Sequence, residues 1–263
     1  MTPSQKAYIL GIRRNYRGAP LEKQLRSVGL QFDVIEGLDS NDLHFDLNLS
    51  KKITSRKQIG FGMSVGEFAC YLGHLRMIQK ASSDMGEIGF FFEDDATLLY
   101  PERFKHIINN FTDLPDGIFC LYRGPNLILF GKELSILGLK FKNSMSIPTG
   151  TIAYMMNRNT IKQYEQYVQQ DNIILQRADY PLTLPNRIKI FTSSESIFSE
   201  RNEASVIGRR EPESVSNFEK IRIYSFYSWL LNRREVPLRR FMKQFHLRYF
   251  SERVFAFFDV FSH

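Results

Sequence analysis

The segment Ile88-Gly89-Phe90-Phe91-Phe92-Glu93-Asp94-Asp95 decides the fold. Its first five residues carry no polar side chain, which is typical of a strand buried on both faces at the centre of a parallel sheet. Three carboxylates follow without a break. In α/β sheets, ligands bind outside the carboxyl ends of the strands. The segment therefore predicts a central strand whose end carries a binding site.

The flanking sequence predicts an α/β fold built around this strand. A strand at residues 6–12, a helix at about 19–28 and a strand at 31–36 form an opening strand–helix–strand unit. Ser64 and Glu67 have the spacing of a capping box, so a helix is expected from there to about Met85. Further strands are expected at 118–122, 151–156 and 188–191, and further helices from Pro101 and over about 157–168.

The acidic triplet has a chemical interpretation and a plain alternative. One or two carboxylates plus substrate phosphates are the usual way in which Mg²⁺ or Mn²⁺ is held. Glu93 and Asp95 occupy alternate positions, so an extended backbone would direct both toward one site. A metal held there would bridge a diphosphate and offset its developing charge. The alternative is an ordinary acidic turn in which Asp95 caps the next element of the chain, and spacing alone leaves both open.

Composition narrows the class of protein. The chain has 263 residues, 43% of them hydrophobic and 24% charged, which excludes global disorder. The net charge of +7 is compatible with nucleic acid, an anionic membrane or a phosphorylated ligand. Cys70 and Cys120 are too few for a disulfide framework or a four-cysteine zinc site. Since the N-terminal stretch lacks a secretory apolar core and no apolar run approaches about 18 residues, we expect a reduced, cytoplasmic protein.

Five blocks, in order and spanning roughly residues 6–198, resemble glycosyltransferase family 25. This family contains bacterial lipooligosaccharide β-1,4-galactosyltransferases and related lipopolysaccharide enzymes. The blocks are the opening strand followed by Arg17, G-E-F-A-C-Y-L-G-H at 66–74, F-E-D-D-A at 92–96, G-T-I-A-Y at 150–154, and Ala178-Asp179-Tyr180. The second block departs from the family's G-E-I-G-C-x-x-S-H, because Gly73 stands where Ser is usual.

The resemblance implies a GT-A type fold, a Rossmann-like mixed sheet that binds a nucleotide sugar and a divalent metal, Mn²⁺ or Mg²⁺. The implied reaction transfers a hexose, most often galactose from UDP-galactose, with inversion to a β-glycoside. The implied acceptor is a hydroxyl of a lipopolysaccharide or lipooligosaccharide core sugar. UDP-glucose or a UDP-N-acetylhexosamine is the alternative donor, and the residues do not discriminate among the three.

Individual roles follow from the same resemblance. Asp95 is assigned to the metal and Glu93 to the metal or the ribose, and the family's pattern does not settle which acid touches the metal directly. The donor site is assigned to Arg17, Glu93, Asp94, Asp95, Gly150 and Thr151. Inversion needs a base opposite the leaving diphosphate, and Asp179 is the candidate. The alternative for Asp179 is a loop carboxylate that is paired with Arg177 or hydrogen-bonded to backbone before Pro181.

Glu67 and His74 are candidates for supporting the site. They lie seven residues apart on one predicted helix, roughly 10 Å along its axis, so they cannot bond each other and an H-E-x-x-H zinc site is excluded. The alternative for Glu67 is a purely structural capping role, and for His74 a buried ring that a backbone carbonyl satisfies.

The C-terminal segment differs from the rest of the chain. We divide the sequence into a catalytic domain (1–200), a linker (201–216) and a helical basic tail (217–263). The tail holds nine basic and four acidic residues, a net +5. Its apolar helical stripe consists of Leu238, Phe241, Met242, Phe245 and Tyr249. Such a helix would lie on an anionic membrane, which places the enzyme on the cytoplasmic face of the inner membrane. Packing on the catalytic domain is the alternative.

Two other classes of protein receive less support. A basic nucleic-acid-binding protein would fit the overall charge, but residues 1–216 are nearly balanced at +2 and carry no zinc-finger spacing or RNP-like motif. We therefore expect no nucleic-acid partner. An inactive scaffold is disfavoured by the intact acidic cluster from Glu93 to Asp95.

Overall fold

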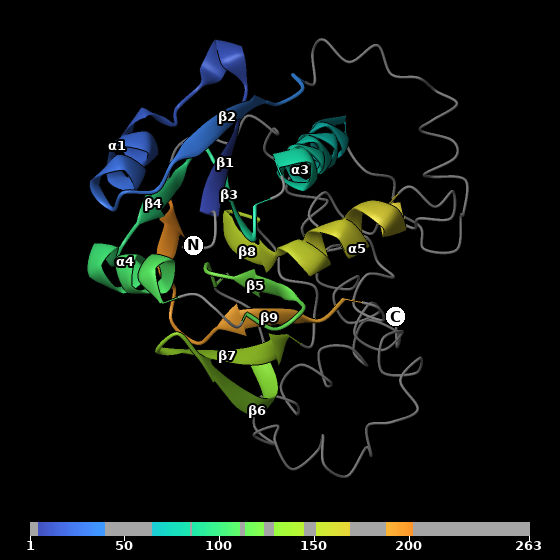
Figure 1. Cartoon of the computed structure of the whole chain (residues 1–263). Coiled ribbons are helices and arrows are strands. Elements are labelled where there is room, and N and C mark those ends of the chain that lie inside the picture. Colours follow the sequence, from blue (N-terminus) through green and yellow to red (C-terminus); the bar gives the residue numbers. More distant parts are fainter. Residues whose placement is uncertain are drawn as a thin grey trace, which may run out of the picture. The chain divides into compact units, whose positions relative to one another are not determined.

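A computed structural model of the chain describes residues 5–39, 65–84, 86–110, 114–123, 129–144, 151–168 and 188–201. These residues form an eight-stranded mixed sheet, a separate two-stranded sheet and flanking helices (Figure 1). The order across the large sheet is β2 (Phe32–Glu36), β1 (Gln5–Gly11), β3 (Ile88–Glu93), β8 (Ala153–Asn157), β5 (Ile118–Cys120), β9 (Ile190–Ser193), β7 (Leu139–Ser144) and β6 (Leu129–Ile136). The small sheet pairs β10 (Phe198–Glu200) with β4 (Ala96–Leu98).

Strand direction brings several strand ends to one edge of the large sheet. β1 is parallel to both β2 and β3. β8 runs antiparallel to both β3 and β5, so β3 and β5 point the same way, and β9 is parallel to β5. The carboxyl ends of β1, β3, β5 and β9 therefore share an edge, and the three acids lie at the end of β3.

Side chains along β3 point alternately to the two faces of the sheet, and each face packs against a hydrophobic cluster. Phe90 and Phe92 point into one hydrophobic cluster with Phe104, whereas Phe91 points into the opposite cluster with Met77. All three β3 phenylalanines are 0% exposed. The strand is therefore buried on both faces, as the sequence predicts.

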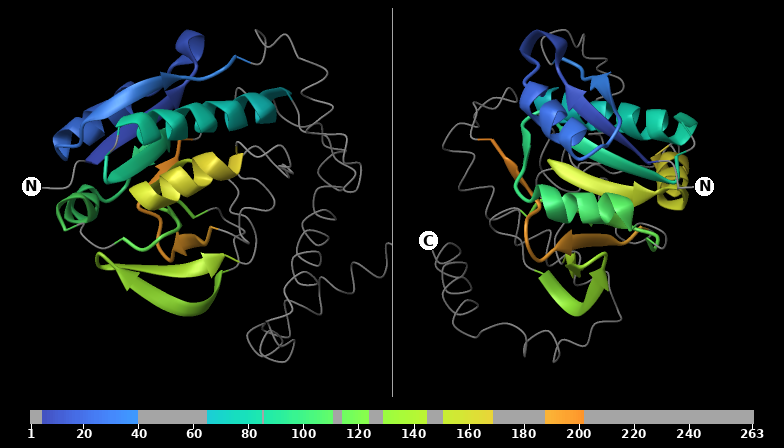
Figure 2. Two further views of the ribbon diagram at one scale, coloured as in Figure 1. Left: turned by 45° about the vertical axis from the view of Figure 1, so that its right-hand side comes forward. Right: turned by 60° about the vertical axis from the view of Figure 1, so that its left-hand side comes forward.

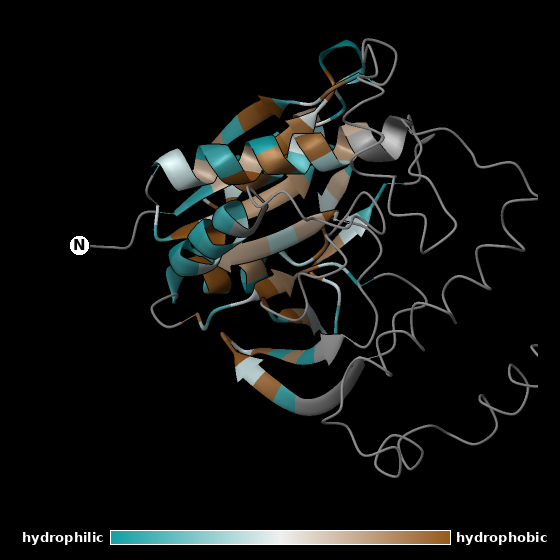
Figure 3. Cartoon of the chain, turned by 90° about the vertical axis from the view of Figure 1, so that its right-hand side faces the viewer, coloured by the Kyte–Doolittle hydropathy of each residue, from teal (hydrophilic) through white to brown (hydrophobic). Residues whose placement is uncertain are grey.

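Helices cover both faces of the sheet. α1 (Ala19–Ser27) and α4 (Pro101–Asn109) lie over one face, and α3 (Val65–Asp84) and α5 (Arg158–Val168) lie over the other (Figure 2). Hydrophilic and hydrophobic residues alternate along the helices, as expected when one side of each packs on the core (Figure 3). A 3₁₀ turn at Arg13–Asn15 follows β1.

The predicted α/β class, a mixed sheet flanked by helices, is confirmed, and it agrees with the GT-A type fold that the resemblance implies. The predicted elements correspond to observed ones with end shifts of at most two residues. β4, β10 and the β6–β7 hairpin were not predicted. The predicted linker and tail lie outside the described residues, apart from Arg201. Within the part that is described, no helix is long and apolar enough to cross a membrane.

Gly73 illustrates how α3 approaches β1. A Cβ atom at this position would lie 2.7 Å from Leu10 Cδ1 and 2.8 Å from Cδ2. Leu10 is itself buried on β1. Glycine at this position therefore allows α3 to approach the Leu10 side chain closely.

Candidate active site

The three acids occupy the turn between β3 and β4. Glu93 is the last residue of β3, and Asp94 and Asp95 connect it to Ala96 at the start of β4. β10 pairs with β4, with Glu200 opposite Ala96, so the chain beyond β10 returns to the same turn. The side chains of Asp94 and Asp95 are only 10% and 12% exposed. The sequence thus folds into a largely buried acidic turn.

Arg17 neutralises part of this charge. Its backbone N–H donates to Asp94 Oδ2 at 3.0 Å. Its Nη2 donates to Asp94 Oδ1 at 3.3 Å and to Asp95 Oδ2 at 3.2 Å. Arg17 lies in the loop between β1 and α1, and because β1 and β3 are adjacent and parallel, this loop meets the acidic turn. The sequence prediction that Arg17 lies with the acids is thus consistent with the structure.

The carboxylate of Glu93 contacts Thr151 and His74. The Thr151 hydroxyl donates to Glu93 Oε1 at 2.5 Å, and His74 Nε2 lies 3.5 Å from the same oxygen. Burial raises the pKa of Glu93, but the interactions with His74, Thr151 and Arg17 outweigh burial and bring the pKa below its usual value. Glu93 is therefore a carboxylate in the folded protein at neutral pH.

Asp94 and Asp95 behave differently. Burial raises the pKa of Asp94 despite its contacts with Arg17. Burial, reinforced by the negative charge of Glu93, raises the pKa of Asp95 to about 7. Burial together with the charge of Glu93 also raises the pKa of Glu200. Burial and the negative charge of Glu93 therefore oppose the ionisation of the other carboxyl groups in this region.

One oxygen in the turn has no visible partner. Asp95 Oδ1 is buried and lacks a hydrogen-bond partner in the structure as described. Carboxylate oxygens are the ligands that Mg²⁺ and Mn²⁺ prefer. The unpartnered oxygen of Asp95 is therefore of the right type for a divalent cation, and Asp95 and Glu93 are the candidate ligands.

A second group of possible ligands lies nearby. Ligand atoms of Cys70, His74 and Glu93 lie within 4.8 Å of one another. Both ring nitrogens of His74 are already engaged, Nε2 with the Thr151 hydroxyl at 2.8 Å and Nδ1 with the Tyr154 hydroxyl at 3.0 Å. A metal on His74 would have to break one of these contacts, so the oxygen-rich turn suits a cation better than this group does.

The structure brings together most of the residues that the sequence singled out. Those whose side chains meet at the end of β3 are Arg17, His74, Glu93, Asp94, Asp95 and Thr151. Thr151 is 1% exposed, and its hydroxyl faces Glu93 and His74. Glu67 lies on α3, but its side chain is outside the described set, and Gly150 and Asp179 lie outside the described residues. The functional roles of these residues remain predictions.

Two residues at the site were missed. Arg201 Nη2 donates to the backbone oxygens of Arg17 and Asp94, each at 2.6 Å, and its N–H donates to Asp95 O at 2.9 Å. This contact spans 107 residues, so no local pattern points to it. Tyr154, which bonds His74, belongs to the G-T-I-A-Y block, and that block was the available signal.

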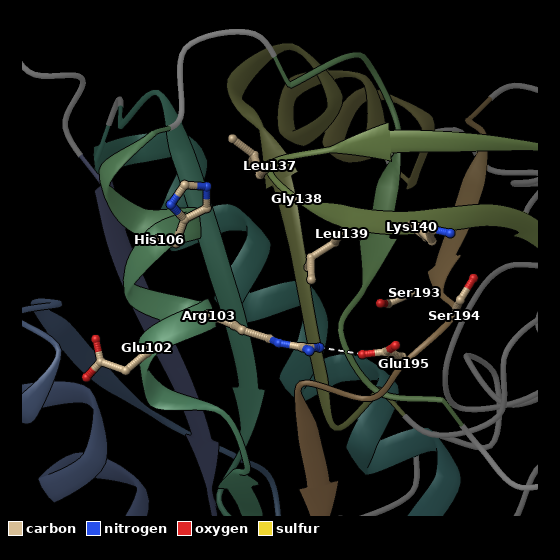
Figure 4. Close-up of a pocket in the computed structure, with 10 residues that line it drawn as sticks. All are labelled: Glu102, Arg103, His106, Leu137, Gly138, Leu139, Lys140, Ser193, Ser194 and Glu195. Atoms are coloured by element: carbon tan, nitrogen blue, oxygen red, sulfur yellow. Dashed lines mark hydrogen bonds and ion pairs between the residues drawn. The ribbon is translucent and has the colours of Figure 1, made fainter.

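A separate pocket of about 400 Å³ lies between α4, the β6–β7 turn and the chain after β9 (Figure 4). Arg103 and Glu195 form an ion pair in it, and His106 and Lys140 line its other sides. None of the predicted site residues lines it. We therefore base the candidate site on the chemistry of the acidic turn.

Comparisons with known proteins show the family to which the chain belongs. A family model described as glycosyltransferase family 25 (LPS biosynthesis protein) matches residues 4–180. The chain is similar to the crystal structure of a glycosyltransferase involved in glycosylation of the major capsid of PBCV-1, with 10% identity, 84% of this chain and 100% of that chain covered, and a TM-score of 0.42. It is also similar to a mutant Drosophila β-1,4-galactosyltransferase solved with manganese, UDP-Gal and xylobiose, with 11% identity, coverage of 81% and 79%, and a TM-score of 0.36. No curated protein sequence matched the chain.

Proposed function

Because the chain belongs to glycosyltransferase family 25, a family of lipopolysaccharide biosynthesis, we propose that it is a metal-dependent, inverting hexosyltransferase. The proposed donor is UDP-galactose. The proposed acceptor is a hydroxyl of a lipopolysaccharide or lipooligosaccharide core sugar, and the product is a β-glycoside. The family membership itself makes the chain a glycosyltransferase that uses a sugar donor and an acceptor.

The observation that carries the metal dependence is the buried acidic turn. Asp95 Oδ1 has no hydrogen-bond partner among the described residues, and Arg17 offsets only part of the charge of three acids. A divalent cation held by Asp95 and Glu93 would supply Lewis acidity for a departing diphosphate. Arg17 is 23% exposed and lies beside the turn, and we assign it to the phosphate oxygens of a bound donor.

The remaining steps belong to residues outside the described part. A sugar hydroxyl is a poor nucleophile while it keeps its proton, so an inverting transfer needs a base on the side opposite the diphosphate. We assign this role to Asp179. We assign docking on the anionic inner-membrane surface, on its cytoplasmic side, to the basic tail at 217–263.

A transfer assay with the full chain tests the proposal. The purified protein is incubated with a core oligosaccharide acceptor and, separately, UDP-galactose, UDP-glucose or a UDP-N-acetylhexosamine, in Mn²⁺, in Mg²⁺ or in EDTA. We expect transfer from UDP-galactose, a β-linked product by NMR, and no transfer in EDTA. Transfer that persists in EDTA would contradict the metal dependence. An α-linked product would contradict inversion, and a preference for another donor would reassign the sugar.

A further inference from the structure

Behind Glu93 lies a continuous chain of buried hydrogen bonds. The Tyr154 hydroxyl is 3.0 Å from His74 Nδ1, His74 Nε2 is 2.8 Å from Thr151 Oγ1, and Thr151 Oγ1 is 2.5 Å from Glu93 Oε1. His74 is 2% exposed, Thr151 1% and Tyr154 2%. The chain joins α3, the strands β3 and β8, and the residue two positions before β8.

Proton counting gives this chain a single direction. A carboxylate only accepts hydrogen bonds, so the one hydroxyl proton of Thr151 goes to Glu93. The Thr151 oxygen must then accept from His74, which places the ring proton on Nε2. At the other end of the ring, Nδ1 lies 3.0 Å from the Tyr154 hydroxyl, within hydrogen-bond distance.

Burial raises the pKa of Tyr154 well above its ordinary value, so its hydroxyl is protonated at neutral pH. This hydroxyl extends the hydrogen-bond chain from His74 into the core.

We propose that His74 and Thr151 are positioning residues that fix the Glu93 carboxylate for donor and cation binding. The inference rests on the proposed function, because it states what Glu93 is positioned for. With Oε1 held by Thr151, the carboxylate is confined to one orientation. Preorganised charge of this kind needs no rearrangement during the reaction. Groups that orient a ligand in this way typically affect metal affinity or activity by about 10–100-fold.

A competing role for His74 is metal ligation with Cys70 and Glu93, whose ligand atoms lie within 4.8 Å of one another. A metal on Nε2 would displace the hydrogen bond to Thr151, and a metal on Nδ1 would displace that to Tyr154. A metal on Nε2 therefore excludes the positioning role, because that nitrogen could no longer donate to Thr151.

Matched variants of Thr151 test the positioning role. Thr151→Val keeps the shape but removes the hydroxyl, and Thr151→Ser keeps the hydroxyl but removes a methyl group. We expect kcat to fall by about 10–100-fold in the valine variant and by less than about threefold in the serine variant, with similar melting temperatures. Equal activity of the two variants would overturn the proposal.

His74 offers a second matched pair. Glutamine places an amide N–H near the position of Nε2, whereas asparagine reaches only the position of Nδ1. We expect His74→Gln to retain more activity than His74→Asn, because only glutamine can donate to Thr151. The opposite order would contradict the assigned direction of the chain.

Nitrogen-15 NMR of the histidine rings tests the hydrogen-bond chain in the absence of any substrate. We expect His74, assigned by the signals lost in His74→Gln, to carry a proton on Nε2, and this proton to lose its hydrogen-bonded shift in Thr151→Val but not in Thr151→Ser. An Nε2 atom without a proton, or a one-to-one transition metal bound at Nε2 that Cys70→Ser removes, would overturn the inference. If the wild-type chain transfers no sugar, the proposed function fails, while this spectrum still decides the hydrogen-bond chain.

Discussion

Asp95 is the acid whose ionisation the fold opposes most. Its pKa is raised from an ordinary value of 3.8 to about 7 by burial and by the charge of Glu93. Between these two pH values the unfolded chain releases the proton while the folded chain keeps it. Stability contributed by this group is therefore greatest at acid pH and falls as the pH rises from about 4 to 7.

Replacing this carboxylate should stabilise the metal-free protein. In EDTA at pH 8, we expect Asp95→Asn to raise the free energy of unfolding by up to about 4 kcal/mol, since the shift from 3.8 to about 7 spans about three pKa units and one unit corresponds to about 1.4 kcal/mol. The gain should shrink toward zero as the pH approaches 4. Urea denaturation at several pH values measures it, and a variant less stable than wild type at pH 8 would show that the contact with Arg17 outweighs burial.

Asp179 is the residue on which the proposed chemistry depends most. We expect Asp179→Asn to bind UDP-sugar nearly as wild type does, because the acidic turn is unchanged, and to lose turnover by a factor of at least about 100, the scale of general base catalysis. Isothermal titration calorimetry and the transfer assay measure the two effects. Normal turnover in this variant would reject Asp179 as the base.

The sequence predicted the candidate site residues that belong to a short, recognisable stretch of the chain. Glu93, Asp94 and Asp95 were predicted because a buried strand leads directly into them, and Thr151 because it belongs to a recognisable block. Arg201 was not predictable, because its contacts with Asp94 and Arg17 exist only when β10 pairs with β4.

Helix α3, which carries His74, is joined to strand β1 by a cluster of ion pairs and hydrogen bonds around Asp84. At the end of α3, Asp84 Oδ2 accepts from Lys6 Nζ at 3.0 Å and from the Tyr8 hydroxyl at 3.1 Å, and Asp84 Oδ1 accepts from Lys80. Burial raises the pKa of Asp84, but the hydrogen bonds from Lys80, Lys6 and Tyr8 outweigh it and lower the pKa below 3.8. This contribution to stability is present above that pH and is lost as the pH falls below it.

We expect Asp84→Asn to lower the free energy of unfolding at pH 7 by about 1–3 kcal/mol, because a partly buried group loses charge-assisted hydrogen bonds. The difference from wild type should diminish below pH 3.8, where the carboxyl itself becomes protonated. Glu133→Gln is the matched control, since the Glu133–Lys140 pair is exposed and should contribute less than about 1 kcal/mol. Equal effects of the two substitutions at pH 7 would contradict the anchoring role of Asp84.

Most elements were predictable because hydrophobic periodicity and caps marked them. The β6–β7 hairpin was missed because its two-residue turn is Leu137-Gly138, with φ of 55° and 73°. Asn-Gly or Asp-Gly normally signals such a turn, and leucine rarely adopts a positive φ. β4 and β10 were missed because each has only three residues, and neither is a strand without the other.

Across the whole chain, charge is unevenly distributed. Residues 1–216 carry +2 and residues 217–263 carry +5. The basic character of the protein therefore belongs to the predicted tail, while the candidate site is acidic. This separation is the basis for assigning surface attachment and chemistry to different parts of the chain.

We expect truncation after Ser216 to abolish binding to anionic vesicles while sparing transfer to a small soluble acceptor. A cosedimentation assay with vesicles containing phosphatidylglycerol measures binding, and neutral phosphatidylcholine vesicles are the control. Unchanged sedimentation of the truncated chain would place membrane attachment elsewhere. Loss of transfer to the soluble acceptor would instead assign the tail to the catalytic domain.

The most direct test of a metal-dependent UDP-sugar site at the acidic turn is a thermal-shift screen of the full chain against UDP-sugars with and without Mn²⁺, in parallel with Asp95→Asn. We predict that UDP-galactose raises the melting temperature of the wild-type protein only when Mn²⁺ is present, and that the variant shows no Mn²⁺-dependent shift. A response to no UDP-sugar, or an equal shift with and without the metal, would contradict this assignment.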